Sequence, residues 1–330
     1  MDDVGVWSGL MRSAFLAGLG EQDRRPLRIA ATLAGGLLLG SVAAFAAWCL
    51  IMAPFTFWIG QAGAGVEGLG RAAVMLKDAA QNGLDLQVAR LAVGVAGESA
   101  FLLVFVAVAA RFSERRLMDF VTAAPKLRWR LLLLGMALSG LVIAPMVAGQ
   151  HLLSGPEAPP LLAVDKAWTG RAIYFAATLL LIPAALVEEL FFRGWMLRQI
   201  GALADRTAPV LILAGILFAA AHFDFDPEAF LQRALMGGGL AYMTLRLGGI
   251  EFAAGVHAMH NILILLFIQP LLQAAASPGL SAFALLYDVA LVASYFIITE
   301  VVVRWAWLQR LGGVDRSQIS PPDDRAVQPG

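Results

Sequence analysis

The chain has 330 residues and no net charge, with 59% hydrophobic and only 15% charged residues. An ordinary soluble domain carries about 25% charged residues, so this composition argues against a soluble protein. Zero net charge gives no electrostatic attraction toward nucleic acid, and no nucleic-acid partner is expected. The single cysteine, Cys49, excludes an intrachain disulfide and any site with several cysteine ligands.

The apolar residues are grouped in long runs rather than alternating with polar ones. Runs of about 18 or more apolar residues are typical of membrane spans. We therefore predict an all-α, polytopic transmembrane bundle with about eight spans and the lipid bilayer as its first partner. The predicted spans are 29–53, 91–110, 131–149, 172–200, 209–223, 228–246, 250–272 and 280–303.

The polar segments at the two ends set the predicted domain boundaries. The first apolar run is too long for the core of a cleaved signal peptide, so we expect it to be retained. Residues 1–28 are predicted to form a cytoplasmic N-terminal segment and residues 29–303 the transmembrane domain. Residues 304–330 are polar and contain prolines, so a disordered cytoplasmic tail is expected.

Basic residues predict the orientation. If both termini are cytoplasmic, most Lys and Arg residues fall in cytoplasmic segments, as membrane proteins prefer. An even number of spans requires the same arrangement. Arg greatly outnumbers Lys, and Ala and Gly are abundant, which is typical of a GC-rich bacterial gene. The expected location is a bacterial inner membrane.

Charged residues inside a predicted span indicate where chemistry occurs. Glu188, Glu189 and Arg193 lie in the fourth span, and each charge costs about 2.5–3.5 kcal/mol at mid-membrane on insertion scales. Glu189 precedes Arg193 by four residues, the favourable order for an ion pair within a helix. Glu188 points about 100° away from Glu189 around the helix axis and has no obvious partner. Such a carboxylate suits a general base; the alternative is a helix end at the lipid headgroups.

The histidines favour a catalytic site over a helix end at the lipid headgroups. His222, His257 and His260 lie in apolar runs, and Asn261 shares a helix face with His257 because the two are four residues apart. At 1.5 Å per residue, Glu188, His222, His257 and Asn261 all lie about 10–20 Å from the cytoplasmic ends of their spans. We therefore expect these four side chains in one layer of the membrane.

This set of side chains can activate water. Glu188 would take a proton from water, His222 and His257 would orient that water or hold a metal, and Asn261 would donate to a developing oxyanion. Two histidines and one glutamate with an open position also match a hydrolytic zinc site, with His222, His257 and Glu188 as ligands. The residues alone leave metal-bound and Glu-activated water both open.

At these residues the chain resembles a known family. The motifs Glu-Glu-x-x-x-Arg, Phe-x-x-x-His and His-x-x-x-Asn occur in order, formed by Glu188, Glu189 and Arg193, by Phe218 and His222, and by His257 and Asn261. Together they resemble the CPBP family of type II CAAX prenyl endopeptidases and bacteriocin-processing relatives, over residues 170–265. In this resemblance Glu189, Arg193 and Phe218 are supporting residues.

The resemblance implies an intramembrane endopeptidase with a CAAX-prenyl-protease-like fold and an active site open to the cytoplasm. It implies Glu188 as base, His222 and His257 at the water or metal, and Asn261 at the oxyanion. The substrate would be a peptide or membrane protein. The family has been described both as metalloproteases and as glutamate proteases, so the resemblance is compatible with a Zn²⁺ cofactor and with none. His260 departs from the motif and could supplement or replace His257.

Two other classes of function compete with a peptidase. Intramembrane Glu, Arg and His residues also line the ion paths of transporters and channels, although the inverted repeats typical of many transporters are not found here. A catalytically silent scaffold of the same fold is the second alternative. Among the remaining intramembrane charges, Glu98 should face protein rather than lipid. It could line a cavity, but we expect it to pair with a basic group such as Arg233. Asp288 is expected to be a packing residue or a polar group that joins two helices.

Overall fold

The computed structural model describes residues 9–58, 74–75, 83–154, 159–164, 168–271 and 281–319. These ranges contain helices and no strand; the β-type pairing is a single bridge between Thr122 and Gly249. The all-α prediction is confirmed. The main helices are α2 (Pro26–Trp58), α4 (Leu84–Ser113), α5 (Trp129–Ser154), α6 (Pro160–Ala163), α7 (Trp168–Thr178), α8 (Leu181–Glu189), η5 (Leu190–Met196), α9 (Leu197–Leu203), α10 (Thr207–Ala220), α11 (Pro227–Leu247), α12 (Glu251–Phe267), α13 (Ala282–Arg304) and α14 (Ala306–Gly312).

Each predicted apolar run corresponds to one helix, except the fourth. That run is divided among α7, α8, η5 and α9, which together cover Trp168–Leu203. Within the described ranges, five helical segments are long and apolar enough to cross a membrane, and α10 and α12 are shorter apolar helices. Helix α11 is less apolar because it carries Glu228, Arg233 and Arg246.

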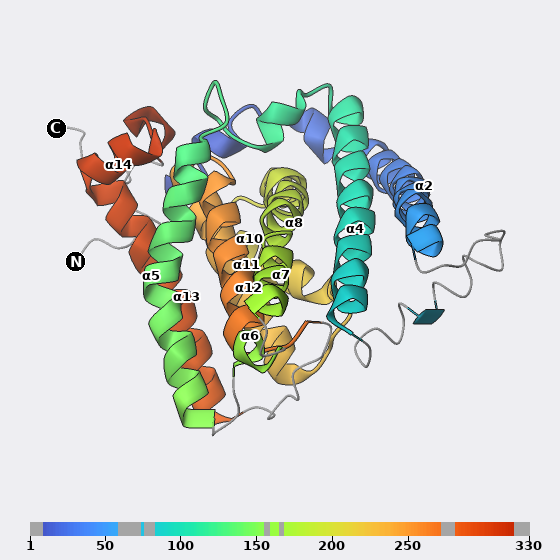
Figure 1. Ribbon diagram of the computed structural model, residues 1–330. Helices are drawn as coiled ribbons and strands as arrows, with labels where there is room; N and C mark the ends of the chain where they lie inside the picture. Colours follow the sequence, from blue (N-terminus) through green and yellow to red (C-terminus); the bar gives the residue numbers. More distant parts are fainter. Residues whose placement is uncertain are drawn as a thin grey trace.

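The helices form a bundle with α8, α10, α11 and α12 in the middle (Figure 1). Helix α2 lies at one edge and packs along α4, while α5 and α13 lie at the opposite edge. Helix α12 packs against α5, α8 and α11, and α10 packs against α11. Half of the α2 residues in 26–53 are exposed and only four are buried, as expected of a helix surrounded by lipid.

Glycines allow the closest contacts between helices. A Cβ on Gly255 of α12 would collide with the carbonyl oxygen of Leu132 on α5, and one on Gly215 of α10 would collide with that of Ala234 on α11. Gly237 on α11 faces the Cα of Gly215, 2.9 Å from the position of an added Cβ. Small residues of this kind let membrane helices approach closely. They bring α12 close to α5 and α10 close to α11.

The segment after α13 differs from the expected disordered tail. Helix α14 packs against α5 with Leu308 buried, and Gln318 accepts a hydrogen bond from Arg128 at 3.0 Å. The prediction of disorder therefore does not apply to residues 304–319. The rest of the predicted tail lies outside the described residues.

A polar pair joins α13 to α11 inside the bundle. The Asp288 carboxylate, which is buried, accepts a hydrogen bond from the Gln232 side chain at 3.1 Å. A buried polar group needs such a partner. Asp288 therefore links two helices, in agreement with the sequence-based expectation.

A buried ion pair fixes the start of α12 and yields a stability prediction. Arg128 binds both carboxylate oxygens of Glu251, at 3.0 and 2.6 Å, and the Glu251 side chain has no exposed surface. Breaking a buried pair leaves a charge without compensation and costs about 3–5 kcal/mol. Glu251→Gln should lower the free energy of unfolding by about that amount in a denaturant titration.

The matched control is Glu114→Gln. Glu114 pairs with Arg28 at 3.4 Å, but its side chain is 76% exposed. Exposed pairs contribute about 0–1 kcal/mol, so this variant should remain close to the wild type. Equal losses in the two variants would contradict a special role for the buried pair.

Candidate active site

The two adjacent glutamates end one helix and begin an irregular one. Glu188 and Glu189 are the last residues of α8, and the following segment, η5, is π-helical. π-Helical segments are rare and often occur at functional sites. Aromatic side chains hold η5 in place: the Phe105 ring lies 4.7 Å from that of Trp195, and the Phe218 ring 5.0 Å from that of Phe192.

Glu189 forms the buried centre of the site. One of its carboxylate oxygens, Oε1, accepts from Arg193 Nη1 at 2.8 Å and lies 2.8 Å from His257 Nδ1. The predicted pairing of Glu189 with Arg193 is thus present, and both side chains are buried. Arg193 also donates to the carbonyl of Gly237 at 3.1 Å and lies over the Phe218 ring. The charge-assisted contact with Arg193 therefore fixes the position of the Glu189 carboxylate.

His257 joins the two glutamates. Because Oε1 of Glu189 already accepts from Arg193, it acts as the acceptor toward His257 as well, and Nδ1 of His257 carries the proton of the bond between them; this tautomer is assigned from the bonding pattern. The other ring nitrogen, Nε2, lies 3.8 Å from Oε2 of Glu188. That separation is too long for a direct hydrogen bond and suits a bridging water. His257 therefore lies between two carboxylates. On one side it faces the partly exposed Glu188, and on the other it contacts Glu189, which is paired with Arg193.

His222 lies near His257 but forms no hydrogen bond with His257, Glu188 or Glu189. It follows the end of α10, is exposed, and its Nδ1 lies 2.8 Å from the carbonyl oxygen of Phe218. The Phe218 ring contacts both histidines edge-on, with centroid distances of 4.8 Å to His222 and 5.7 Å to His257. Phe218 therefore separates the two imidazoles and positions both.

The remaining polar residues of α12 face different neighbours. Asn261, one turn after His257, is half-buried, and none of the described residues forms a hydrogen bond with its side chain. His260 is buried, and its Nδ1 lies 3.3 Å from the Tyr295 hydroxyl on α13. His257, rather than His260, is the histidine that contacts the glutamates.

Glu98 has a different environment from the one predicted. Within the described residues no ion pair joins it to Arg233, which instead binds Asp224 at 2.9 Å. This contact holds the pKa of the Asp224 carboxyl, in the loop after α10, below its usual value. Glu98 is exposed on α4 and interacts electrostatically with Glu188 and His257. It therefore belongs to the surroundings of the site.

The side chains do not assemble a three-ligand metal site in the part of the chain that the structure describes. No group of three or more His, Cys, Asp or Glu residues is placed to hold a metal ion there. Catalytic zinc needs about three protein ligands. Glu188 and His257 face each other, whereas His222 lies beyond the Phe218 ring, so the three residues named from sequence as ligands of a possible metal do not form such a group here.

The fold and these contacts define a polytopic membrane protein with a buried Glu–His–Glu–Arg cluster. Residues 170–263, which contain all three motifs, match the family model described as "Type II CAAX prenyl endopeptidase Rce1-like". This match supports the resemblance to the CPBP family and a CAAX-type intramembrane protease in general. Together with the apolar helices it identifies an integral membrane protein.

A curated relative shares part of the sequence. The "Uncharacterized protein YyaK" of Bacillus subtilis (strain 168) is 30% identical over 164 residues, an alignment that includes 47% of this chain. The chain spans about half the length of that relative, namely 53%. No solved structure matches the chain.

Proposed function

We propose that this protein is an intramembrane endopeptidase that hydrolyses peptide bonds with water activated by Glu188. The observation that carries the proposal is the pair of contacts made by His257. Its Nδ1 is held by Glu189 at 2.8 Å, and its Nε2 faces Glu188 at 3.8 Å. A fixed imidazole opposite a carboxylate is an arrangement that can orient and deprotonate one water.

The proposed reaction uses groups of this chain. A water between Glu188 and His257 donates one hydrogen bond to each, which directs its lone pair toward a substrate carbonyl. Glu188 takes the proton as the water oxygen bonds to the carbonyl carbon. The Asn261 amide donates to the resulting oxyanion. The proton then passes from Glu188 to the leaving amine as the carbon–nitrogen bond breaks.

His222 and Glu98 indicate the side from which water and substrate approach. Both are exposed, whereas His257 and Glu189 are buried behind them. The Glu188 side chain is 13% exposed, so it is the catalytic carboxylate closer to the open side. We infer that the substrate reaches Glu188 from this side and that His222 assists at its carbonyl oxygen.

The function is tested with the purified full-length protein and a library of internally quenched peptides. Some of the peptides carry a prenylated C-terminal cysteine, and products are identified by mass spectrometry. Cleavage at an internal bond by wild type, absent in Glu188→Gln, is expected. A strong chelator is added in parallel, and loss of cleavage would show a metal requirement. Cleavage that is equal in both proteins would contradict the proposal, and ion flux in proteoliposomes would then test the transporter alternative.

The two histidines of α12 should behave differently when replaced. His257→Ala removes the group opposite Glu188 and should lower kcat/KM by about 10²–10⁴-fold. His260→Ala should retain most activity, but it leaves the buried Tyr295 hydroxyl without its partner and should reduce stability by about 1–3 kcal/mol. Initial rates and unfolding titrations of both variants check this contrast. A large activity loss in His260→Ala at unchanged stability would assign the catalytic role to His260.

A further inference from the structure

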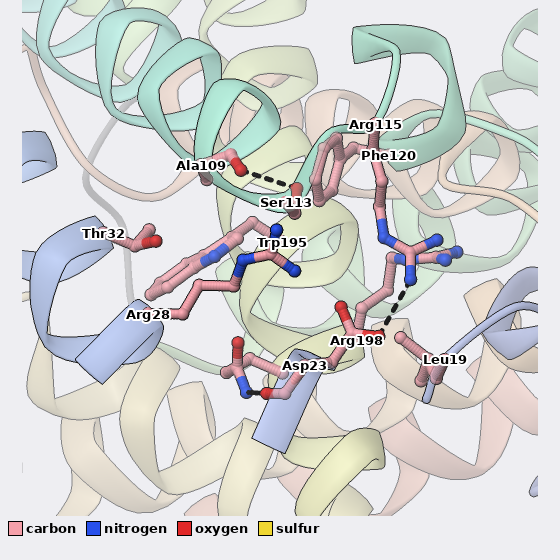
Figure 2. A pocket seen from close by; sticks show the side chains of 11 residues that line it. Leu19, Asp23, Arg28, Thr32, Ala109, Ser113, Arg115, Phe120, Trp195 and Arg198 are labelled. Atoms are coloured by element: carbon pink, nitrogen blue, oxygen red, sulfur yellow. Dashed lines mark hydrogen bonds and ion pairs between the residues drawn. The ribbon is translucent and has the colours of Figure 1, made fainter. Parts of the chain in front are cut away.

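A second polar pocket lies at the end of the bundle where α2 begins and α4 ends (Figure 2). It is a small hollow, part of it open to solvent. Side chains from three separate segments line it: Arg28 from α2, Arg115 from the segment after α4, and Arg198 from α9. Asp23 is the acidic residue of the lining. Trp195 of η5 lines the pocket, but none of the candidate catalytic residues Glu188, His222, His257 and Asn261 does.

The positive charges of this pocket exceed its negative charge. Asp23 binds Arg115 at 2.9 Å, which leaves two arginines of the lining without a carboxylate inside the pocket. Arg28 reaches Glu114 at 3.4 Å, but that glutamate is 76% exposed at the rim. Because like charges in a partly buried space repel one another strongly, a bound anion would stabilise this arrangement.

Arg198 provides the second observation. Its side chain is 95% buried, at 5% exposure, and lines the pocket. One nitrogen donates to the carbonyl oxygen of Phe15 and another to that of Ala17 at 3.3 Å, but Nε is buried without a hydrogen-bond partner. Buried guanidinium donors are normally satisfied, so Arg198 adds an incompletely paired positive charge to the wall of the pocket. A tetrahedral oxyanion supplies several acceptors to arginine at once.

The depth of the pocket fits a lipid headgroup. Its lining residue Thr32 lies about 9 Å along α2 from Pro26, at 1.5 Å per residue. The headgroup zone of a bilayer is about 5–7 Å thick on each side. If α2 enters the bilayer at Pro26, the pocket lies at the level of the phosphates, and the exposed apolar side chains Leu37 and Leu38 follow it further along α2. Basic pockets between membrane helices bind acidic headgroups in this way.

We propose that this pocket binds a phosphate group, supplied by an anionic phospholipid whose acyl chains lie along α2 and α4. The phosphate oxygens accept hydrogen bonds from Arg28, and the positive charge of the neighbouring Arg198 side chain attracts the anion. Bound in this position, the lipid connects α2 to α9, the helix that follows η5.

The test measures thermal unfolding of the full-length protein in neutral detergent micelles during titration with phosphatidylglycerol, phosphatidylcholine or inorganic phosphate. Phosphatidylglycerol should raise Tm in a saturable manner, and phosphatidylcholine should not. Arg28→Gln should weaken the apparent affinity for phosphatidylglycerol about tenfold, the effect of losing one charge-assisted contact. The same Arg28-dependent effect with inorganic phosphate alone would support the phosphate site and assign it to a free anion instead of a lipid.

Arg116→Gln is the matched control. Arg116 lies close to Arg115 in sequence, but its side chain is 86% exposed and it does not line the pocket. Equal weakening in Arg28→Gln and Arg116→Gln would overturn the proposal, because it would indicate attraction to surface charge alone. Equal stabilisation by the two phospholipids would overturn it as well. If Arg28→Gln does not fold, Arg28→Lys is titrated with the same two lipids and judged by that second criterion.

Discussion

Glu188→Gln is expected to lower kcat/KM for peptide hydrolysis by about 10²–10⁴-fold, the usual contribution of a general base. Glutamine keeps the size and hydrogen-bonding capacity of the side chain but cannot take a proton. Glu188 forms no ion pair with Arg193, so its charge is not needed to neutralise a buried cation. The free energy of unfolding should therefore remain close to that of the wild type. Initial rates on the best peptide of the library and denaturant unfolding of the same preparations provide the two measurements.

The matched control for this variant is Glu21→Gln, which makes the same chemical change at an exposed position near the start of α2. It should leave both rate and stability unchanged. If Glu188→Gln retains activity within about tenfold of the wild type, the residue does not act as the base. A loss of activity accompanied by an equal loss of stability would indicate that Glu188 is a structural residue instead.

Composition and run length predicted the architecture because the membrane imposes it. A chain with these apolar runs must satisfy its backbone hydrogen bonds internally, which leaves helices as the solution for spans of this length. Seven of the eight predicted spans accordingly correspond to single helices. The folded segment after α13 was missed because its order depends on distant partners. Gln318 is fixed by Arg128, a contact that no local pattern reveals.

The motifs identified the catalytic candidates, but their mutual arrangement required the structure. Spacing alone indicated the pairing of Glu189 with Arg193, since helical periodicity governs both residues. It did not indicate that Glu189 also binds His257, a contact across two helices. The π-helical turn of η5 is also invisible to periodicity, because it depends on packing of its aromatic residues against α4 and α10.

Glu98 shows that the sequence of a single helix does not predict which residues of other helices its side chains contact. An intramembrane carboxylate predicts a polar neighbour, and Arg233 was a reasonable partner on charge alone. The partner of Arg233 is Asp224, which lies only nine residues away in sequence. Glu98 instead interacts with Glu188 and His257, because α4 packs beside α8. Helix order in the bundle, rather than charge, decides which residues meet.

Glu189→Ala should affect stability and activity together, for different reasons. The substitution leaves the Arg193 guanidinium, which is 1% exposed, without its carboxylate, and loss of one partner of a buried ion pair costs about 3–5 kcal/mol. It also removes the acceptor that holds His257 Nδ1, so the imidazole is no longer fixed opposite Glu188. We expect kcat/KM to fall by about 10²-fold or more, as when a catalytic histidine is misplaced. Unfolding titrations and initial rates measure the two effects.

The double variant Glu189→Ala/Arg193→Met separates the two effects. Replacing a buried ion pair by apolar side chains is often neutral or stabilising, so most of the lost stability should return. Activity should not return, because His257 still lacks the oxygen that fixes its orientation. Recovery of both properties would contradict a positioning role, and would show that Glu189 serves only to neutralise Arg193. Recovery of stability alone would establish that the buried carboxylate orients the histidine on which the proposed chemistry depends.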